Sequence, residues 1–211
     1  MLTALIPELN FSRFQRAIVV LLAAELLNQR DLFLAANPGA TDEHLSDYSA
    51  YVSDGQFYTQ DVSKYPLINV WVGNSAPLND TIVRYHGDHA LHFDLFAYRQ
   101  TEQKENGDII EATTAADKRL NYLIAQVFHT MGAQVNNWKG AGNLFSSCTY
   151  MGWQKMPPEK TPAGVPVIMA RMTYSLRTED LKEILVGWDV EAFTAEIIAN
   201  NKELTELIIT T

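Results

Sequence analysis

The order of predicted elements between residues 88 and 178 constrains the fold of this chain more than any other feature of its sequence. Apolar and polar residues alternate over 88–98, and a polar loop separates this run from a long amphipathic segment that starts near residue 114. A second alternating run covers 165–177. A period of two indicates half-buried strands, and a period near 3.6 indicates a helix packed on one side. The order strand, helix, loop, strand without a catalytic signature is typical of a small packing unit and favours an assembly protein over an enzyme.

Length and composition are those of an ordinary globular protein. A chain of 211 residues with 47% hydrophobic and 19% charged residues can fill one core, so we expect a single domain over 1–211. The formal net charge of −9 argues against a general nucleic-acid binder, which needs clustered Lys and Arg. The longest apolar run near the N-terminus, residues 17–24, is far shorter than the roughly 20 residues of a membrane span, so we expect no membrane association.

An amphipathic helix is predicted near the N-terminus. Asn10 or Ser12 can cap it, and apolar residues keep helical spacing to about Gln29. The segment 37–39 (Asn-Pro-Gly) ends this helix or a short continuation of it. We expect the helix to be covered on more than one side.

A second helix is predicted over residues 114–131. Thr114 is a suitable N-cap, and Asp117 stands three residues on, in a relation like a capping box. Gly132 supplies the stop. The apolar stripe that would pack on the sheet consists of Ala116, Leu120, Leu123, Ile124, Val127, Phe128 and Met131.

Strands are predicted on both sides of this helix. Gly87-Asp88 favours a tight hairpin, and a break is expected at Met156-Pro157-Pro158. Within the hairpin, residues 91, 93 and 95 share one face and residues 92, 94 and 96 the other. The predicted strands cover residues 67–72, 81–86, 89–98, 147–154 and 165–177.

The remaining segments are predicted as additions to this core. Residues 41–65 are interpreted as a surface insertion with one helical turn, 99–108 as a solvated loop, and the chain from about 180 as a helical extension. The fold class is therefore α+β, with a mixed or antiparallel sheet of four or five strands packed against two main helices.

Two residue patterns could indicate metal-dependent sites. The spacing of His86, His89 and His92 suggests a metal site, but in a hairpin only His86 and His89 can meet, so we expect no metal and no cofactor. A small metal-dependent nuclease is the enzyme alternative. It would be built on Asp88, Asp94, Glu102 and Lys104.

Cys148 is the only cysteine, which excludes an intrachain disulfide and indicates a reducing compartment. Its strand-like surroundings offer no base partner, so we expect a buried, inert thiol.

The chain resembles the tail terminator proteins of long-tailed bacteriophages. The resemblance is one of pattern over residues 66–177, and it rests on four segments that occupy the places of the family's strands and helix. These segments are residues 65–71, 92–98, 115–131 and 167–177, the last of which contains Met169-Ala-Arg-Met-Thr-Tyr-Ser-Leu-Arg177.

The resemblance implies a structural virion protein that forms a hexameric ring, caps the tail tube and provides the surface for head docking. Its implied partners are other copies of itself, the tail tube protein, a neck or head-completion protein, and DNA that passes without specific binding. Another neck, head-completion or tube protein of the same particle is the nearest alternative. Because loops and aromatic residues carry partner contacts, the candidate interface residues are Gln100, Glu102, Lys104, Glu105, Trp138 and Phe145. For the two aromatic residues, plain core packing is the alternative.

Overall fold

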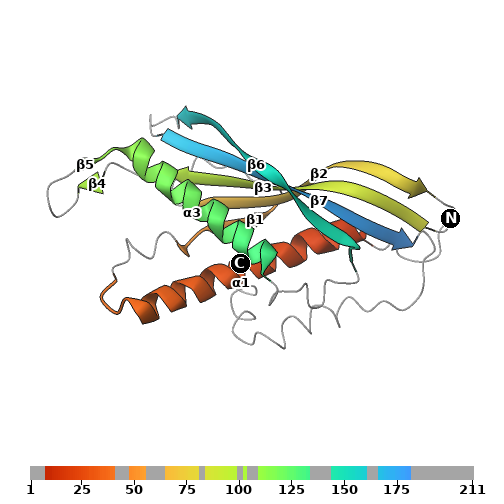
Figure 1. Cartoon of the computed structure of the whole chain (residues 1–211), viewed down its shortest axis with the longest axis horizontal. Coiled ribbons are helices and arrows are strands. Elements are labelled where there is room, and N and C mark those ends of the chain that lie inside the picture. Colours follow the sequence, from red (N-terminus) through yellow and green to blue (C-terminus); the bar gives the residue numbers. More distant parts are fainter. Residues whose placement is uncertain are drawn as a thin grey trace.

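The computed structural model describes residues 8–40, 48–55, 65–80, 84–98, 102–103, 109–133, 144–160 and 166–181. These residues form a five-stranded sheet in the order β1-β2-β3-β7-β6, with two helices on one of its faces (Figure 1). The elements are α1 (Asn10–Ala36), β1 (Tyr51–Asp54), β2 (Leu67–Asp80), β3 (Arg84–Tyr98), β4 (Glu102–Gln103), β5 (Ile109–Ile110), α3 (Ala112–Gly132), β6 (Ser147–Lys160) and β7 (Pro166–Leu181). The α+β prediction with a mixed sheet is confirmed, because β1 runs parallel to β2 and the other pairs are antiparallel.

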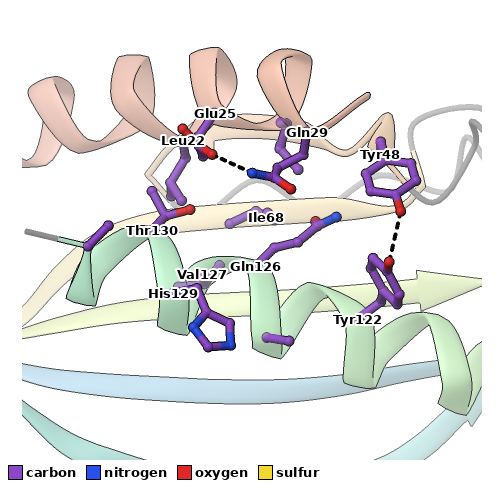
Figure 2. Close-up of a pocket in the computed structure, with 13 residues that line it drawn as sticks. Leu22, Glu25, Gln29, Tyr48, Ile68, Tyr122, Gln126, Val127, His129 and Thr130 are labelled. Atoms are coloured by element: carbon purple, nitrogen blue, oxygen red, sulfur yellow. Dashed lines mark hydrogen bonds between the residues drawn. The ribbon is translucent and has the colours of Figure 1, made fainter. Parts of the chain in front are cut away.

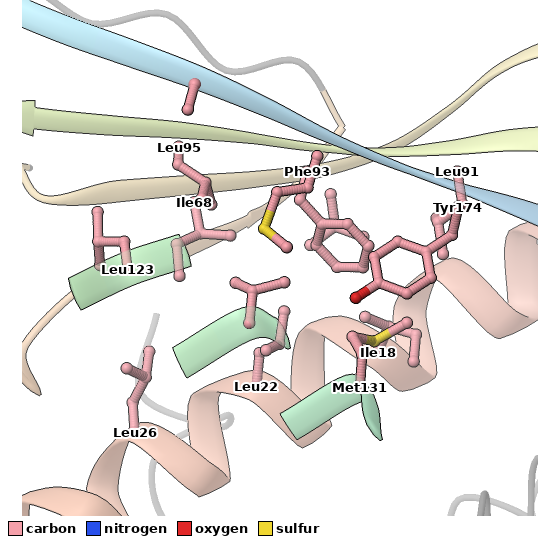
Figure 3. Packing of buried hydrophobic residues seen from close by; sticks show 14 of the residues in the cluster. Ile18, Leu22, Leu26, Ile68, Leu91, Phe93, Leu95, Leu123, Met131 and Tyr174 are labelled. Carbon is pink, nitrogen blue, oxygen red and sulfur yellow. The ribbon is translucent and has the colours of Figure 1, made fainter. Parts of the chain in front are cut away.

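The core lies between the two helices and one face of the sheet (Figure 3). Alternate residues of β3 point into it, and Leu91, Phe93 and Leu95 are fully buried, as predicted. The stripe on α3 is confirmed for Ala116, Leu120, Leu123, Val127 and Met131, while Ile124 is half-buried. Phe128 was wrongly included, because its side chain is exposed. Burying such side chains stabilises the fold by about 1.5–3 kcal/mol each, so this layer supplies much of the driving force for folding.

Helix α1 is longer than its apolar spacing suggested. Phe14, Ile18, Leu22 and Leu26 are its buried residues, and the helix continues past Gln29 to Ala36. Nothing in residues 30–36 breaks a helix, and the stop falls at Asn37, whose backbone N–H bonds to the carbonyls of the last turn. The predicted caps are wrong, because Leu9 holds the N-cap position and no side chain caps the helix.

The predicted start of α3 is also wrong by two residues. The helix begins at Ala112, with Glu111 at the N-cap and no side-chain cap. Asp117 makes no capping box. Its Oδ1 instead accepts a hydrogen bond from Lys155 Nζ of β6 at 2.6 Å. The Asp117 carboxylate, predicted to cap the helix, therefore forms an ion pair between α3 and β6.

The predicted turn at Gly87-Asp88 is wrong. β3 runs straight through both residues, because β2 ends at Asp80 and β3 already begins at Arg84. Gly87 is paired with Pro77 of β2 on one side and Thr178 of β7 on the other. Because both neighbours supply strand pairing here, continuing the strand satisfies more backbone groups than a turn would. The register of β2 shifts twice, between Val72 and Ser75 and between Pro77 and Asn79.

Residues 51–54 were predicted as part of a surface loop, and they instead form β1. This strand pairs parallel to β2, with Tyr51 opposite Leu67. A strand of four residues is too short to show an alternating pattern, so its pairing depends on a neighbour that follows later in the chain. The described residues of the predicted insertion therefore include one edge of the sheet.

The later strands are longer than predicted. β6 does not end at Met156-Pro157-Pro158 but shifts register between Met156 and Glu159 and continues to Lys160. Proline is tolerated there because β6 lies at the edge of the sheet and needs backbone donors on one side only. β7 extends to Leu181. The predicted polar loop 99–108 contains β4, which pairs with β5 just after the loop. The predicted C-terminal helix lies outside the described residues.

Candidate interaction surfaces

The face of the sheet opposite the helices carries a polar cluster centred on Asp94 of β3. Arg171 of β7 donates two hydrogen bonds to this carboxylate, from Nε to Oδ1 at 2.6 Å and from Nη2 to Oδ2 at 2.9 Å. Trp71 Nε1 of β2 donates a third to Oδ2 at 2.9 Å. The Asp94 carboxylate is fully buried, whereas Arg171 keeps part of its side chain exposed. The cluster joins three strands across the middle of this face.

Aromatic contacts extend the same cluster. The guanidinium of Arg171 lies over the Trp71 ring at 5.0 Å, and the ring of His92 packs against Trp71 at 4.5 Å. Thr173 Oγ1 lies 3.1 Å from His92 Nδ1. Gly73 makes room for this histidine, since a Cβ at that position would come within 2.8 Å of His92 Nε2. Burial and the nearby Arg171 lower the pKa of His92, so the neutral ring is favoured.

A second ion pair lies on the same face. Arg177 Nε donates to Asp88 Oδ1 at 2.9 Å and its Nη2 to Oδ2 at 3.1 Å, in the same two-pronged geometry. This pair is more exposed than the Asp94 pair. The hydrogen bond from Arg177 holds the pKa of Asp88 below its usual value.

The histidines do not come together as the predicted hairpin required. His89 points to the covered face, where its Nε2 lies 2.8 Å from Thr178 Oγ1 and its ring packs on Phe11 of α1. His92 points to the opposite face, and the side chain of His86 is not described. Within the described part of the chain, no group of three or more His, Cys, Asp or Glu side chains could hold a metal ion.

Of the residues proposed for a nuclease site, Asp88 and Asp94 can be placed. They lie six residues apart on β3, which corresponds to about 20 Å, and each is occupied by its own arginine. Glu102 lies in β4 opposite Ile110, and Lys104 falls outside the described residues. The two placed carboxylates therefore do not share a site.

The outer edge of β6 exposes large apolar side chains. Met151 is 65% exposed and Trp153 48%, and Tyr150 and Phe128 of α3 are also exposed. The rings of Phe128 and Tyr150 meet edge to face at 5.3 Å. β6 is the last strand of the sheet, and its register shifts between Tyr150 and Gly152, with Gly152 at φ 132°. We call Phe128, Tyr150, Met151 and Trp153 the β6 edge patch.

The candidate interface residues are only partly visible. Phe145 is half-buried at the margin of the core, and its ring packs on Phe14 at 4.7 Å. One side of that ring therefore belongs to the core. The side chain of Glu102 is not described, and Gln100, Lys104, Glu105 and Trp138 lie outside the described residues.

Neither the Asp94 cluster nor the β6 edge patch was predicted from the sequence. The Asp94 cluster needs the register of three strands, which no local pattern contains. The β6 edge patch had a signal, because residues 150, 151 and 153 lie in a run predicted as a strand. What was missing was the position of that strand at the edge of the sheet.

Cys148 of β6 is half-buried against the core, and burial raises the pKa of its thiol to about 12. We expect native protein at pH 8 to react very slowly with iodoacetamide, because far fewer of its thiols are ionised than the roughly one-tenth expected for an exposed thiol with a pKa near 9. Mass spectrometry of timed samples measures this. Protein unfolded in urea is the control and should be alkylated rapidly, whereas equal rates in both states would contradict the burial of Cys148.

The same shift predicts a loss of stability at alkaline pH. The thiol contributes fully below its unfolded-state pKa, near 9, because both states are then protonated. Above that pH only the unfolded state loses its proton, so stability falls as pH rises towards 12.

Comparison of the chain with protein-family models and with curated proteins finds no match. No helix in the described ranges has the length and apolar character needed to cross a membrane.

Proposed function

We propose that this protein is a tail terminator of a long-tailed bacteriophage. Its copies form a closed, hexameric ring that caps the tail tube and joins it to the head through a neck or head-completion protein. The ring is assembled in the host cytoplasm and stays in the virion. The proposal rests on the order of strands and helices and on the resemblance of residues 66–177 to that family.

The β6 edge patch is the observation that favours assembly most strongly. Phe128 and Tyr150 are in ring contact, and Met151 and Trp153 are exposed farther along the same edge strand. Exposed side chains of these types are enriched at protein interfaces. The opposite edge of the sheet is the short strand β1. The two edges therefore differ in length and in side chains. A contact between the β6 edge patch of one subunit and a different surface of the next subunit is heterologous. Such contacts close into rings when the rotation between subunits permits.

The charge of the chain suits a channel for DNA. With a formal net charge of −9, carboxylates that line a lumen would repel phosphate and let DNA pass without sticking. The segments 100–108 and 138–145 and the two termini of the chain are proposed to supply the second patch of each subunit contact.

Negative-stain microscopy of the concentrated protein tests this function. We expect closed rings, and we expect Trp153→Glu to abolish them, since loss of a central interface tryptophan costs about 2 kcal/mol or more of association free energy. The matched control is Leu32→Glu, which also replaces an exposed apolar residue, on α1, and should leave the rings intact.

The other outcomes separate the alternatives. Long stacked tubes would contradict a terminator and favour a tube subunit. Rings of Trp153→Glu as abundant as those of the wild type would show that the β6 edge patch is not the interface. An unchanged melting temperature for Trp153→Glu establishes that any loss of rings is not a loss of folding.

A further inference from the structure

A pocket of about 560 Å³ lies between α1 and α3, with β2 behind it (Figure 2). This volume falls within the range of about 300–1,000 Å³ that is usual for sites that bind small molecules. None of the lining residues belongs to the β6 edge patch or to the Asp94 cluster, and Phe128 of the patch is in ring contact with His129 of the lining.

The inner wall of this pocket is apolar. Leu22 and Leu26 come from α1, Val127 from α3 and Ile68 from β2, and all four are buried members of the core. They offer a hydrocarbon surface on which an alkyl chain can pack and lose its contact with water.

Glu25 gives the pocket its charge. Among the thirteen residues drawn in Figure 2 it is the only carboxylate, and none of them is Lys or Arg. Asn28 and Gln29 donate amide hydrogen bonds to Glu25 Oε1, at 3.2 and 2.7 Å. The other oxygen, Oε2, has no hydrogen-bond partner among the described residues. A fixed carboxylate with one open oxygen is a ready acceptor for a charged donor.

Two tyrosines form one end of the pocket. The hydroxyls of Tyr48 and Tyr122 lie 2.8 Å apart, and the Tyr48 ring packs on Phe33 at 5.0 Å. Phe33 follows Glu25 by eight residues of α1, or about 12 Å along the helix. The lining therefore combines one carboxylate and an apolar floor with a pair of tyrosine hydroxyls at the far end.

We propose that this pocket binds a small organic cation, an ammonium or guanidinium group on an alkyl stem. The charged head donates to Glu25 Oε2, and the stem lies along Leu22, Leu26 and Val127. A free small molecule is favoured over one side chain of a partner, because the pocket is larger than a single lysine or arginine side chain needs.

Titration with n-hexylammonium, followed by the amide resonances of the protein, tests the proposal. We expect saturable shifts at residues of α1 and α3 that line the pocket at millimolar concentration, and binding about tenfold or more weaker for the neutral n-hexanol. Glu25→Gln should weaken binding about tenfold or more, because it replaces a charge-assisted hydrogen bond. Asp31→Asn is the matched control, since Asp31 is an exposed carboxylate of α1 outside the pocket, and it should leave the affinity unchanged.

The comparison of n-hexylammonium with n-hexanol needs no variant, so it stands even if Glu25→Gln unfolds the protein. Equal binding of both compounds, or no binding of the amine, would overturn the proposal. A lysine whose amino and carboxyl groups are both blocked mimics a lysine side chain of a partner protein, which is the other possible source of the ammonium group. If it binds and n-hexylammonium does not, the pocket receives a partner's side chain and the proposed small molecule is wrong.

Discussion

Leu123→Asp is expected to unfold the protein. Leu123 is fully buried in the layer where α3 packs on β3 and β7. The substitution removes a buried leucine and places a carboxyl group where the surroundings are apolar, at a cost of more than about 4 kcal/mol. That is a large part of the roughly 5–15 kcal/mol by which domains of this kind are stable. Circular dichroism and urea denaturation measure the loss.

Asn121→Asp is the matched control for this substitution. Asn121 is exposed on the same helix, two residues before Leu123. Its replacement introduces the same aspartate side chain as Leu123→Asp. Its expected effect is a few tenths of a kcal/mol, from repulsion by Asp117 four residues earlier. A folded Leu123→Asp protein with near-normal stability would show that the apolar stripe of α3 does not face the core.

The second large effect is expected at Asp94. Asp94→Ala removes the buried carboxylate that accepts hydrogen bonds from both Arg171 and Trp71 and that neutralises Arg171, at a cost of about 3 kcal/mol. Urea denaturation at neutral pH measures the loss.

Asp88→Ala gives the comparison that isolates burial. Asp88 lies on the same strand and also receives two hydrogen bonds from one arginine of β7, but this pair is largely exposed to water. Its removal should have a much smaller effect, because water and salt screen exposed pairs. Equal losses for the two variants would mean that geometry and not burial sets the strength of these pairs.

Much of the core follows from local pattern. Residues 91, 93 and 95 alternate with polar neighbours, and Leu120, Leu123 and Val127 recur at helical spacing, so each element shows its buried face without help from the others. The fold class and the covered face of the sheet could therefore be predicted.

The errors arose where distant segments decide the structure. Gly87-Asp88 has the composition of a turn, but pairing with β2 and β7 keeps it in a strand. In that case pairing with strands far away in the sequence outweighs a local preference. Asp117 does not cap α3 because the helix begins earlier, at Ala112, which leaves Asp117 beyond the first turn, where it pairs with Lys155 of β6.

The same limit applies to the surfaces. Asp94 and Arg171 are 77 residues apart, and only the register of β3 against β7 places them opposite each other. The β6 edge patch depends on the order of strands, which leaves β6 outermost. The candidate interface residues were predicted from the polar and aromatic composition of their segments. Among them, Phe145 is the one whose side chain the structure describes.

Electron microscopy of the intact virion tests the proposed function most directly. We expect density for this chain in one ring between the tail tube and the neck, with the β6 edge patch buried between neighbouring subunits. Density for this chain repeated along the tube, located in the head, or absent from the particle would contradict its assignment as a tail terminator.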